Sequence, residues 1–285
     1  MSREYALYDT TLRDGAQCED MQLTTPDKVK IALRLDELGV DYIEGGWPGA
    51  NPVDSEFFRE IAACELKTAR VAAFGSTHHP SHAAENDPTL MALLSCGAGV
   101  LTIFGKSSER HARDALRLDP ARNLDIIRDS VAFLRSRAEE VFFDAEHFFD
   151  GWKENRDYTL AALKRAHEAG ASALVLCDTN GGSLPEEIAA ITAEAVRELP
   201  GAVVGIHAHN DCELGVANTV AAVRAGARHI QGTMNGVGER CGNANLCSVI
   251  PVLELKLGIR CLPEGALGQM TAASRYVSEV ANMTP

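Results

Sequence analysis

Short apolar runs alternate with longer amphipathic segments along the chain, at a spacing of roughly thirty residues. The runs have the composition of buried strands, and the segments between them carry apolar residues at helical spacing. We therefore predict eight strand–helix pairs. The predicted strands are residues 5–9, 42–44, 70–74, 100–104, 141–146, 173–177, 203–207 and 229–233, and the predicted helices are residues 25–38, 53–64, 87–95, 120–138, 155–169, 185–199, 214–225 and 243–257.

This repeat favours an α/β fold of the TIM (β/α)8 barrel type, occupying residues 1–260. The runs are apolar on both faces, as expected for parallel strands covered by helices. Helices stop at glycines such as Gly39, and Thr25 is the expected N-cap of the first helix. A doubly wound sheet of fewer strands is the alternative. A further helix over residues 262–280 predicts a short C-terminal helical extension, residues 261–285.

The seventh predicted strand ends in the histidine pair His207 and His209, followed by Asn210 and Asp211. Side chains in a strand alternate between faces, so the two imidazoles point to the same side. Neutral imidazoles in this arrangement can bind one divalent cation. The alternative is a pair of hydrogen-bonded histidines near a sheet edge.

Polar residues gather after the carboxyl ends of the predicted strands, where barrel enzymes carry their catalytic groups. The amino ends of the strands show no comparable group, and this one-sided distribution predicts an enzyme. The polar segments are residues 11–15, Glu44, residues 144–147, residues 178–181, residues 207–211 and residues 235–240.

Asp14 adds a carboxylate to the two imidazoles, although an aspartate before glycine is also typical of a turn. The combined set suits Mn²⁺, Zn²⁺, Fe²⁺ or Co²⁺, with Mg²⁺ less favoured by imidazoles. Arg13 is either a surface charge or a guanidinium that binds a substrate carboxylate.

Three other polar residues each allow two interpretations. Glu146 lies among aromatic residues in the sequence and is either a proton-transferring carboxyl or a structural one. Thr179 is either an N-cap or a hydrogen-bond donor to substrate. Asn243 either caps the eighth helix or completes the metal shell.

Composition limits the partners and the compartment. The 285 residues are 46% hydrophobic and 24% charged, with a formal net charge of −13, which argues against nucleic acid or an anionic membrane as partner. The N-terminus lacks a signal peptide, and no apolar run is long enough to span a bilayer. None of the eight cysteines forms a Cys-x-x-Cys pair, so we expect a cytoplasmic protein with reduced thiols.

Three motifs resemble signatures of the isopropylmalate/homocitrate/citramalate synthase family, within the DRE-TIM metallolyase superfamily. They are residues 12–17 (LRDGAQ) with Lys28 downstream, residues 207–211 (HAHND) and residues 238–243 (GERCGN). The resemblance covers essentially the whole chain. Residues 44–51, 73–77, 144–150 and 177–182 are most similar to the citramalate synthase branch.

The resemblance implies condensation of acetyl-CoA with a 2-oxo acid, with pyruvate giving citramalate in the isoleucine branch of amino-acid biosynthesis. It also implies a homodimer that uses Mn²⁺, Zn²⁺, Mg²⁺ or Co²⁺. The implied metal ligands are Asp14, His207 and His209, with Asn243 in or near the shell; the implied catalytic residues are Glu146 and Arg13; and the implied substrate-binding residues are Arg13, Gln17, Glu44 and Thr179. In the family a lid subdomain and a regulatory domain follow the barrel, and we expect this chain to end before both.

Other functions remain open at this level. A 2-isopropylmalate or homocitrate synthase would use the same chemistry on a different 2-oxo acid. A related metal-dependent lyase or aldolase would cleave a carbon–carbon bond instead. A non-catalytic barrel used as a binding module is a third possibility, which the crowded strand ends argue against.

Overall fold

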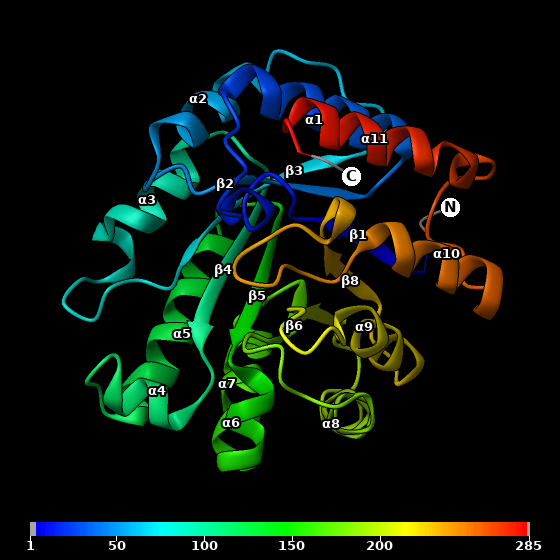
Figure 1. Ribbon diagram of the computed structural model, residues 1–285. Coiled ribbons are helices and arrows are strands. Elements are labelled where there is room, and N and C mark those ends of the chain that lie inside the picture. Colours follow the sequence, from blue (N-terminus) through cyan, green and yellow to red (C-terminus); the bar gives the residue numbers. More distant parts are fainter. Residues whose placement is uncertain (1–3, 284–285) are drawn as a thin grey trace.

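The computed structural model describes residues 4–283 and shows a closed barrel of eight parallel strands surrounded by helices (Figure 1). Each strand pairs with the next in sequence, and β8 closes the barrel on β1. The strands are β1 (Ala6–Asp9), β2 (Tyr42–Gly46), β3 (Arg70–Ser76), β4 (Val100–Lys106), β5 (Glu140–Glu146), β6 (Ala173–Asp178), β7 (Val204–Ala208) and β8 (His229–Gly232). The TIM barrel prediction is confirmed, and the open sheet is excluded.

All eight predicted helices are present, with ends that differ by a few residues. They are α1 (Thr25–Leu38), α2 (Pro52–Ile61), α3 (Pro88–Ser95), α5 (Pro120–Arg135), α7 (Arg156–Glu168), α8 (Pro185–Glu198), α9 (Gly215–Arg224) and α10 (Leu246–Leu257). The sequence interpretation missed α4 (Glu109–Asp114) and α6 (Phe148–Glu154), which are too short to show a full helical period. The helix expected over residues 262–280 is η4 (Ala266–Gln269) followed by α11 (Met270–Val280); the other short helices are η1 (Gly15–Gln17), η2 (Ala84–Asn86) and η3 (Met234–Gly236).

Two predicted helix caps are wrong by one or two residues. Thr24, rather than Thr25, caps α1, because its side chain accepts from the Asp27 backbone N–H while the Asp27 side chain accepts from the Thr24 N–H. Asn245, rather than Asn243, caps α10 by accepting from the Cys247 N–H. The glycine stop at Gly39 is confirmed, since it adopts φ +90° and donates to Leu35 and Asp36.

Aromatic and imidazole rings fill the barrel interior toward the amino ends of the strands, and polar side chains fill it toward the carboxyl ends. Tyr8, Tyr42, Phe142 and His229 pack against one another with ring centroids 4.8–6.1 Å apart. A larger apolar core lies between the strands and the helices. This division leaves the carboxyl ends of the strands for polar chemistry.

Helix α11 lies alongside α1 on the outside of the barrel (Figure 1). Its buried side chains Met270, Ala273 and Val277 belong to the same core as the helices of the barrel. Helix α11 also contacts η3, where Asn235 Nδ2 donates to the Ser274 carbonyl and to Ser278 Oγ. The C-terminal extension therefore packs as one more element of the barrel's outer layer.

Within the described part of the chain, no helix has both the length and the apolar character that a membrane span requires.

Candidate active site

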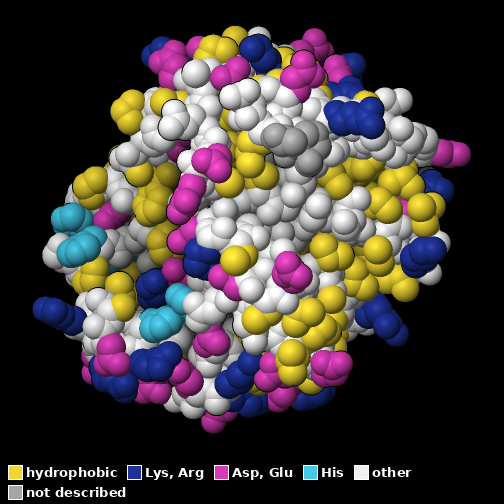
Figure 2. Space-filling model, in the orientation of Figure 1, with side chains coloured by type: hydrophobic (Ala, Val, Ile, Leu, Met, Phe, Trp, Pro, Cys, Tyr) yellow, Lys and Arg dark blue, Asp and Glu magenta, His cyan; other side chains and the backbone are white. Residues whose placement is uncertain are grey.

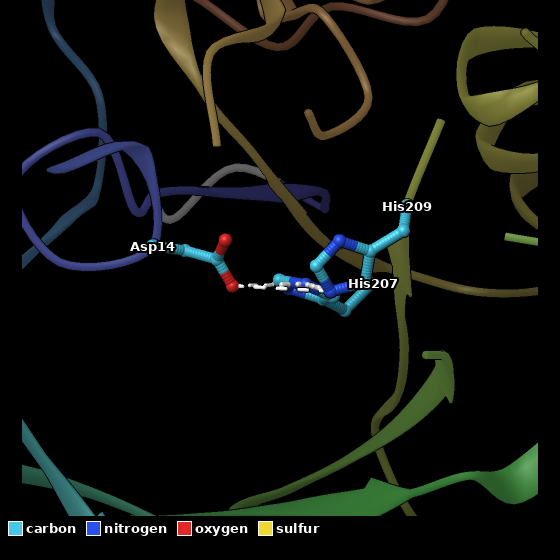
Figure 3. Close-up of side chains that lie close together, drawn as sticks. All are labelled: Asp14, His207 and His209. Atoms are coloured by element: carbon cyan, nitrogen blue, oxygen red, sulfur yellow. Dashed lines mark hydrogen bonds and ion pairs between the residues drawn. The ribbon is translucent and has the colours of Figure 1, made fainter. Parts of the chain in front are cut away.

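Three side chains from two strand ends meet at the carboxyl end of the barrel (Figure 3). Asp14 comes from the loop after β1, His207 lies within β7, and His209 directly follows that strand. His207 Nε2 and His209 Nε2 lie 3.6 Å and 3.9 Å from Asp14 Oδ2, and 3.3 Å from each other. All three residues are buried, and their ligand atoms lie within 4.8 Å of one another. The structure thus brings together the three residues that the sequence suggested as metal ligands.

The electrostatics of this cluster suit a divalent cation. Burial lowers the pKa of His207, and burial together with the neighbouring His207 lowers the pKa of His209 to about 4. Burial acts to raise the pKa of Asp14, but the Arg13 guanidinium and the two imidazoles outweigh it and hold that pKa well below its usual range. The site therefore offers one carboxylate and two neutral imidazoles near neutral pH, the protonation state that a metal requires.

Asn243 lies beside the cluster and orients Asp14. Its Nδ2 donates to Asp14 Oδ1 at 2.8 Å and to the Val237 carbonyl at 3.3 Å. Its Oδ1 is buried and has no hydrogen-bond partner within residues 4–283. A buried amide oxygen that lacks a partner fits the edge of a metal shell, where an ion or its bound water would satisfy it.

Arg13 is held between two carboxylates and an aromatic ring. Its Nε donates to Glu44 Oε2 at 2.6 Å, its Nη1 donates to Asp14 Oδ2 at 3.0 Å, and its guanidinium carbon lies 3.8 Å from the centroid of the Phe74 ring. Its Nη2 makes no hydrogen bond to any residue between 4 and 283, and Arg13 lines the central cavity. A fixed guanidinium with donors left over is suited to binding a carboxylate.

Glu44 lies behind Arg13, below the cavity lining. It is fully buried, its oxygens accept from Tyr8 Oη, Thr10 Oγ1 and Arg13 Nε, and it does not line the cavity. Because its acceptor sites face these donors, Glu44 holds the Arg13 guanidinium in place from behind the cavity lining.

Glu146 lies at the end of β5, beside a lysine that the sequence interpretation missed. Its Oε2 lies 2.5 Å from Lys106 Nζ, at the end of β4. The predicted fourth strand stopped at Phe104, two residues short of Lys106. Extending that strand by its alternation would have placed Lys106 on the same face as Phe104, at the carboxyl end where polar groups gather.

Thr179 follows β6 and is positioned by the neighbouring loop. Its Oγ1 accepts from the His147 N–H at 2.8 Å, while His147 adopts the left-handed conformation with φ +57°. Because the hydroxyl oxygen already accepts this bond, its own hydrogen is available to donate into the cavity that Thr179 lines. The N-cap interpretation of Thr179 is wrong, since Leu184 occupies the N-cap position of α8.

A cavity of about 1060 Å³ opens above these residues, and Figure 2 shows the hollow on this face, with charged and apolar side chains around it. Trp47, Phe74 and Phe104 form an aromatic wall, with Phe74 stacked on Phe104 and Trp47 edge-on to both. The sequence-derived site residues on the cavity lining are Arg13, Asp14, Gln17, Glu146, Thr179, His207 and His209.

The loops after β6, β7 and β8 are joined by Arg240. It makes a bidentate pair with Asp211, with Nε and Nη2 donating at 2.8 Å and 2.9 Å, and Nη2 also donates to the Thr179 carbonyl at 2.8 Å. Glu213, in the loop after β7, is exposed and has φ +57°, a backbone conformation that favours glycine. Its carboxylate is therefore accommodated at the surface, away from the buried ligand atoms.

Comparison with known proteins agrees with this geometry. The HMGL-like family model matches residues 4–277. A relative from Synechocystis sp., named (R)-citramalate synthase, is 51% identical over 286 residues, covering 98% of this chain and 52% of that protein. A relative from Bradyrhizobium sp., named 2-isopropylmalate synthase, is 35% identical over 253 residues, covering 88% of this chain and 47% of that protein.

Among solved structures, the HMG-CoA lyase of Bacillus subtilis superposes with a TM-score of 0.82 at 21% sequence identity, covering 99% of this chain and 95% of that chain. At that identity the likeness supports the fold alone. The chain spans about half the length of the curated relatives that it matches. Because the family model covers nearly the whole chain, and the relatives match it from end to end of the barrel, the chain belongs to the HMGL-like family.

Proposed function

We propose that the chain forms the catalytic barrel of a metal-dependent citramalate synthase, an acyltransferase that condenses acetyl-CoA with pyruvate. The observation that carries the proposal is that the Asp14, His207 and His209 cluster faces the same cavity as Arg13 and Glu146. Support also comes from the relatives, since those named (R)-citramalate synthase are 49–51% identical to this chain and those named 2-isopropylmalate synthase 32–35%.

The donor set fits a divalent metal, with Asp14, His207 and His209 as ligands and Asn243 at the edge of the shell. When bound there, such an ion supplies Lewis acidity to the keto group of the oxo acid. Two imidazoles favour Mn²⁺, Zn²⁺ or Co²⁺ over Mg²⁺ as the occupant.

The protein side chains bind the oxo acid and transfer the proton. Arg13 and the Thr179 hydroxyl donate hydrogen bonds to the oxo-acid carboxylate and fix its orientation. Glu146, held at the cavity wall by Lys106, takes a proton from the acetyl methyl group. The resulting enolate carbon attacks the keto carbon, the keto oxygen takes up a proton to become a hydroxyl group, and water then hydrolyses the thioester to release coenzyme A. Gln17 is exposed on the cavity rim and is placed to contact a substrate as it enters.

Pyruvate is the proposed oxo acid because an aromatic wall lies beside Arg13 on the cavity lining. Phe74 stacks on Phe104, with ring centroids 5.4 Å apart, and the Arg13 guanidinium carbon lies 3.8 Å from the centroid of the Phe74 ring. A methyl group fits against such a wall more easily than an isopropyl or carboxyethyl group. This assignment would place the protein in the isoleucine branch of amino-acid biosynthesis.

To test the proposal, the full-length protein is assayed with acetyl-CoA and each of pyruvate, 2-oxoisovalerate and 2-oxoglutarate. The quantity measured is the rate at which free coenzyme A thiol is released. We expect pyruvate to give the highest kcat/KM, and Glu146→Gln to lower kcat by about a hundredfold or more. Phe104→Ala should raise the relative rate with 2-oxoisovalerate. A preference for 2-oxoisovalerate or 2-oxoglutarate would indicate one of the related synthases, and cleavage of a 3-hydroxyacyl thioester without any oxo-acid condensation would indicate a lyase.

We also propose that the protein works in the cytoplasm as a homodimer. No disulfide joins its eight cysteines, all of which fall within residues 4–283, as expected in a reducing compartment. The homodimer rests on the family resemblance, and light scattering at several protein concentrations tests it.

A further inference from the structure

Gln231 is a fully buried side chain on β8 that lies directly behind His207. Its Oε1 lies 2.9 Å from His207 Nδ1. Its Nε2 lies 3.2 Å from Asp144 Oδ1 and 3.4 Å from His229 Nε2. One amide thus joins a candidate metal ligand to two further polar groups inside the barrel, and neither Gln231 nor its partners Asp144 and His229 has a part in the proposed chemistry.

The amide directs Nε2 toward Asp144 and His229 and Oε1 toward His207. Burial lowers the pKa of His229 to about 3, so its imidazole is neutral near pH 7 and can accept a hydrogen bond at Nε2. Burial raises the pKa of Asp144 to about 8, so near pH 7 its carboxyl carries a proton on one oxygen and keeps the other oxygen as an acceptor. A flipped amide would turn its oxygen toward Asp144 and His229 and its NH₂ group toward His207, and would favour the opposite tautomer of His207. The observed orientation gives Nε2 acceptors at Asp144 Oδ1 and His229 Nε2 and leaves Oε1 as an acceptor for His207.

We propose that Gln231 is a positioning residue that fixes the tautomer of His207. By accepting from His207 Nδ1–H, it keeps the proton on that nitrogen and leaves the Nε2 lone pair facing Asp14 and His209, where a divalent cation would bind. Outer hydrogen bonds of this kind orient ligating histidines and strengthen metal binding. The inference rests on the proposed metal role of His207.

His209 provides an internal comparison. Its Nδ1 is buried and has no hydrogen-bond partner within residues 4–283. Nothing comparable to Gln231 holds the proton on that nitrogen, so His207 is the ligand with the fixed tautomer and His209 the one whose tautomer can adjust. His207 and His209 are equally buried. We nevertheless expect the proton to stay on Nδ1 in His207 and to occupy either ring nitrogen in His209.

Long-range ¹H–¹⁵N NMR of the imidazoles tests the tautomer directly in metal-free wild-type protein near pH 7.5. We expect His207 to be protonated on Nδ1. If wild-type His207 is instead protonated on Nε2, this measurement alone overturns the proposal, and no substitution is needed. This measurement does not depend on whether the protein condenses acetyl-CoA, so it separates failure of the inference from failure of the proposed function.

Two substitutions at Gln231 test its effect on metal affinity, measured by chelator competition with Zn²⁺ and Mn²⁺. Gln231→Leu removes the acceptor, and we expect a mixture of His207 tautomers and a Kd weaker by about 10- to 100-fold. Gln231→Glu retains an acceptor for Nδ1–H, so the His207 tautomer should be kept. Asn123→Leu is the matched control, because Asn123 is a buried amide that bonds to Lys106 O and Tyr158 Oη instead; its Kd should stay within about twofold of wild type.

A Gln231→Leu protein that keeps the Nδ1–H tautomer and a wild-type Kd would contradict the proposal. So would an equal loss of affinity in Asn123→Leu, since that would attribute the effect to general destabilisation.

Discussion

His209 supplies one of the three candidate ligand atoms, and its replacement tests the proposed metal centre at the scale of a single residue. Without its Nε2, Asp14 and His207 leave a two-ligand site, which binds a divalent cation weakly. We expect about one metal ion per chain in the wild type and less than about a tenth of that in His209→Ala, measured by elemental analysis after dialysis. His79→Ala, which alters an exposed histidine after β3, is the control and should retain wild-type metal. Equal metal content in His209→Ala and wild type would rule out the site.

His229 gives the fold a defined pH dependence. Its folded-state pKa of about 3 lies below the ordinary value because burial favours the neutral imidazole. Above pH 6.5 the His229 imidazole is neutral in both the folded and the unfolded protein, so the free energy of unfolding has its full value. As pH falls from about 6.5 toward 3, the unfolded protein binds a proton that the folded protein does not, and stability is lost. By pH 5 the loss from this residue is about 2 kcal/mol.

Urea unfolding at pH 7.5 and pH 5 measures this loss. We expect the wild type to lose about 2 kcal/mol more than His229→Gln over that interval, because the other titrating groups are common to both proteins. The same pH dependence in both proteins would show that His229 is not held neutral by the fold.

At the scale of elements, the N-cap of α1 differs between the sequence prediction, Thr25, and the structure, Thr24. Thr24 exchanges hydrogen bonds with Asp27, whereas the Thr25 hydroxyl makes only a 3.4 Å contact with the Val53 carbonyl. We predict that Thr24→Ala lowers the free energy of unfolding by about 1 kcal/mol and Thr25→Ala by less than half of that. Equilibrium urea unfolding measures both. A larger effect at Thr25 would favour the cap that the sequence suggested.

At the scale of the whole molecule, the buried side chains of α11 join the apolar core that lies between the strands and the outer helices. Val277 is buried against the same apolar cluster as α1 and α10, and both tryptophans, Trp47 and Trp152, lie outside α11. We expect Val277→Ala to lower the stability reported by tryptophan fluorescence by about 2 kcal/mol, in a single transition. Leu255→Ala on α10 is the control, since Leu255 is 68% exposed, and it should change stability little. A Val277→Ala protein with unchanged fluorescence transition would mean that α11 unfolds independently.

The sequence by itself determined the element order and the barrel, and it predicted that Asp14, His207 and His209 would be candidate metal ligands. Hydrophobic periodicity is a local property, so strands and long helices can be placed from neighbouring residues alone. Eight such units leave few closed topologies, and parallel strands bring their carboxyl ends to one side. Asp14, His207 and His209 follow from that rule, since each lies at or just after the end of its strand.

Only the tertiary structure decided how side chains from different strands pair. Glu44 lies behind Arg13, Lys106 reaches Glu146, and Gln231 faces His207, each across a gap in sequence that no local pattern spans. These pairings depend on the register between strands and on the direction of each side chain, both of which the closed barrel fixes at once. A side chain at a strand end can therefore be expected to face the site, but whether it contacts a substrate or supports its neighbour is decided by the packing around it.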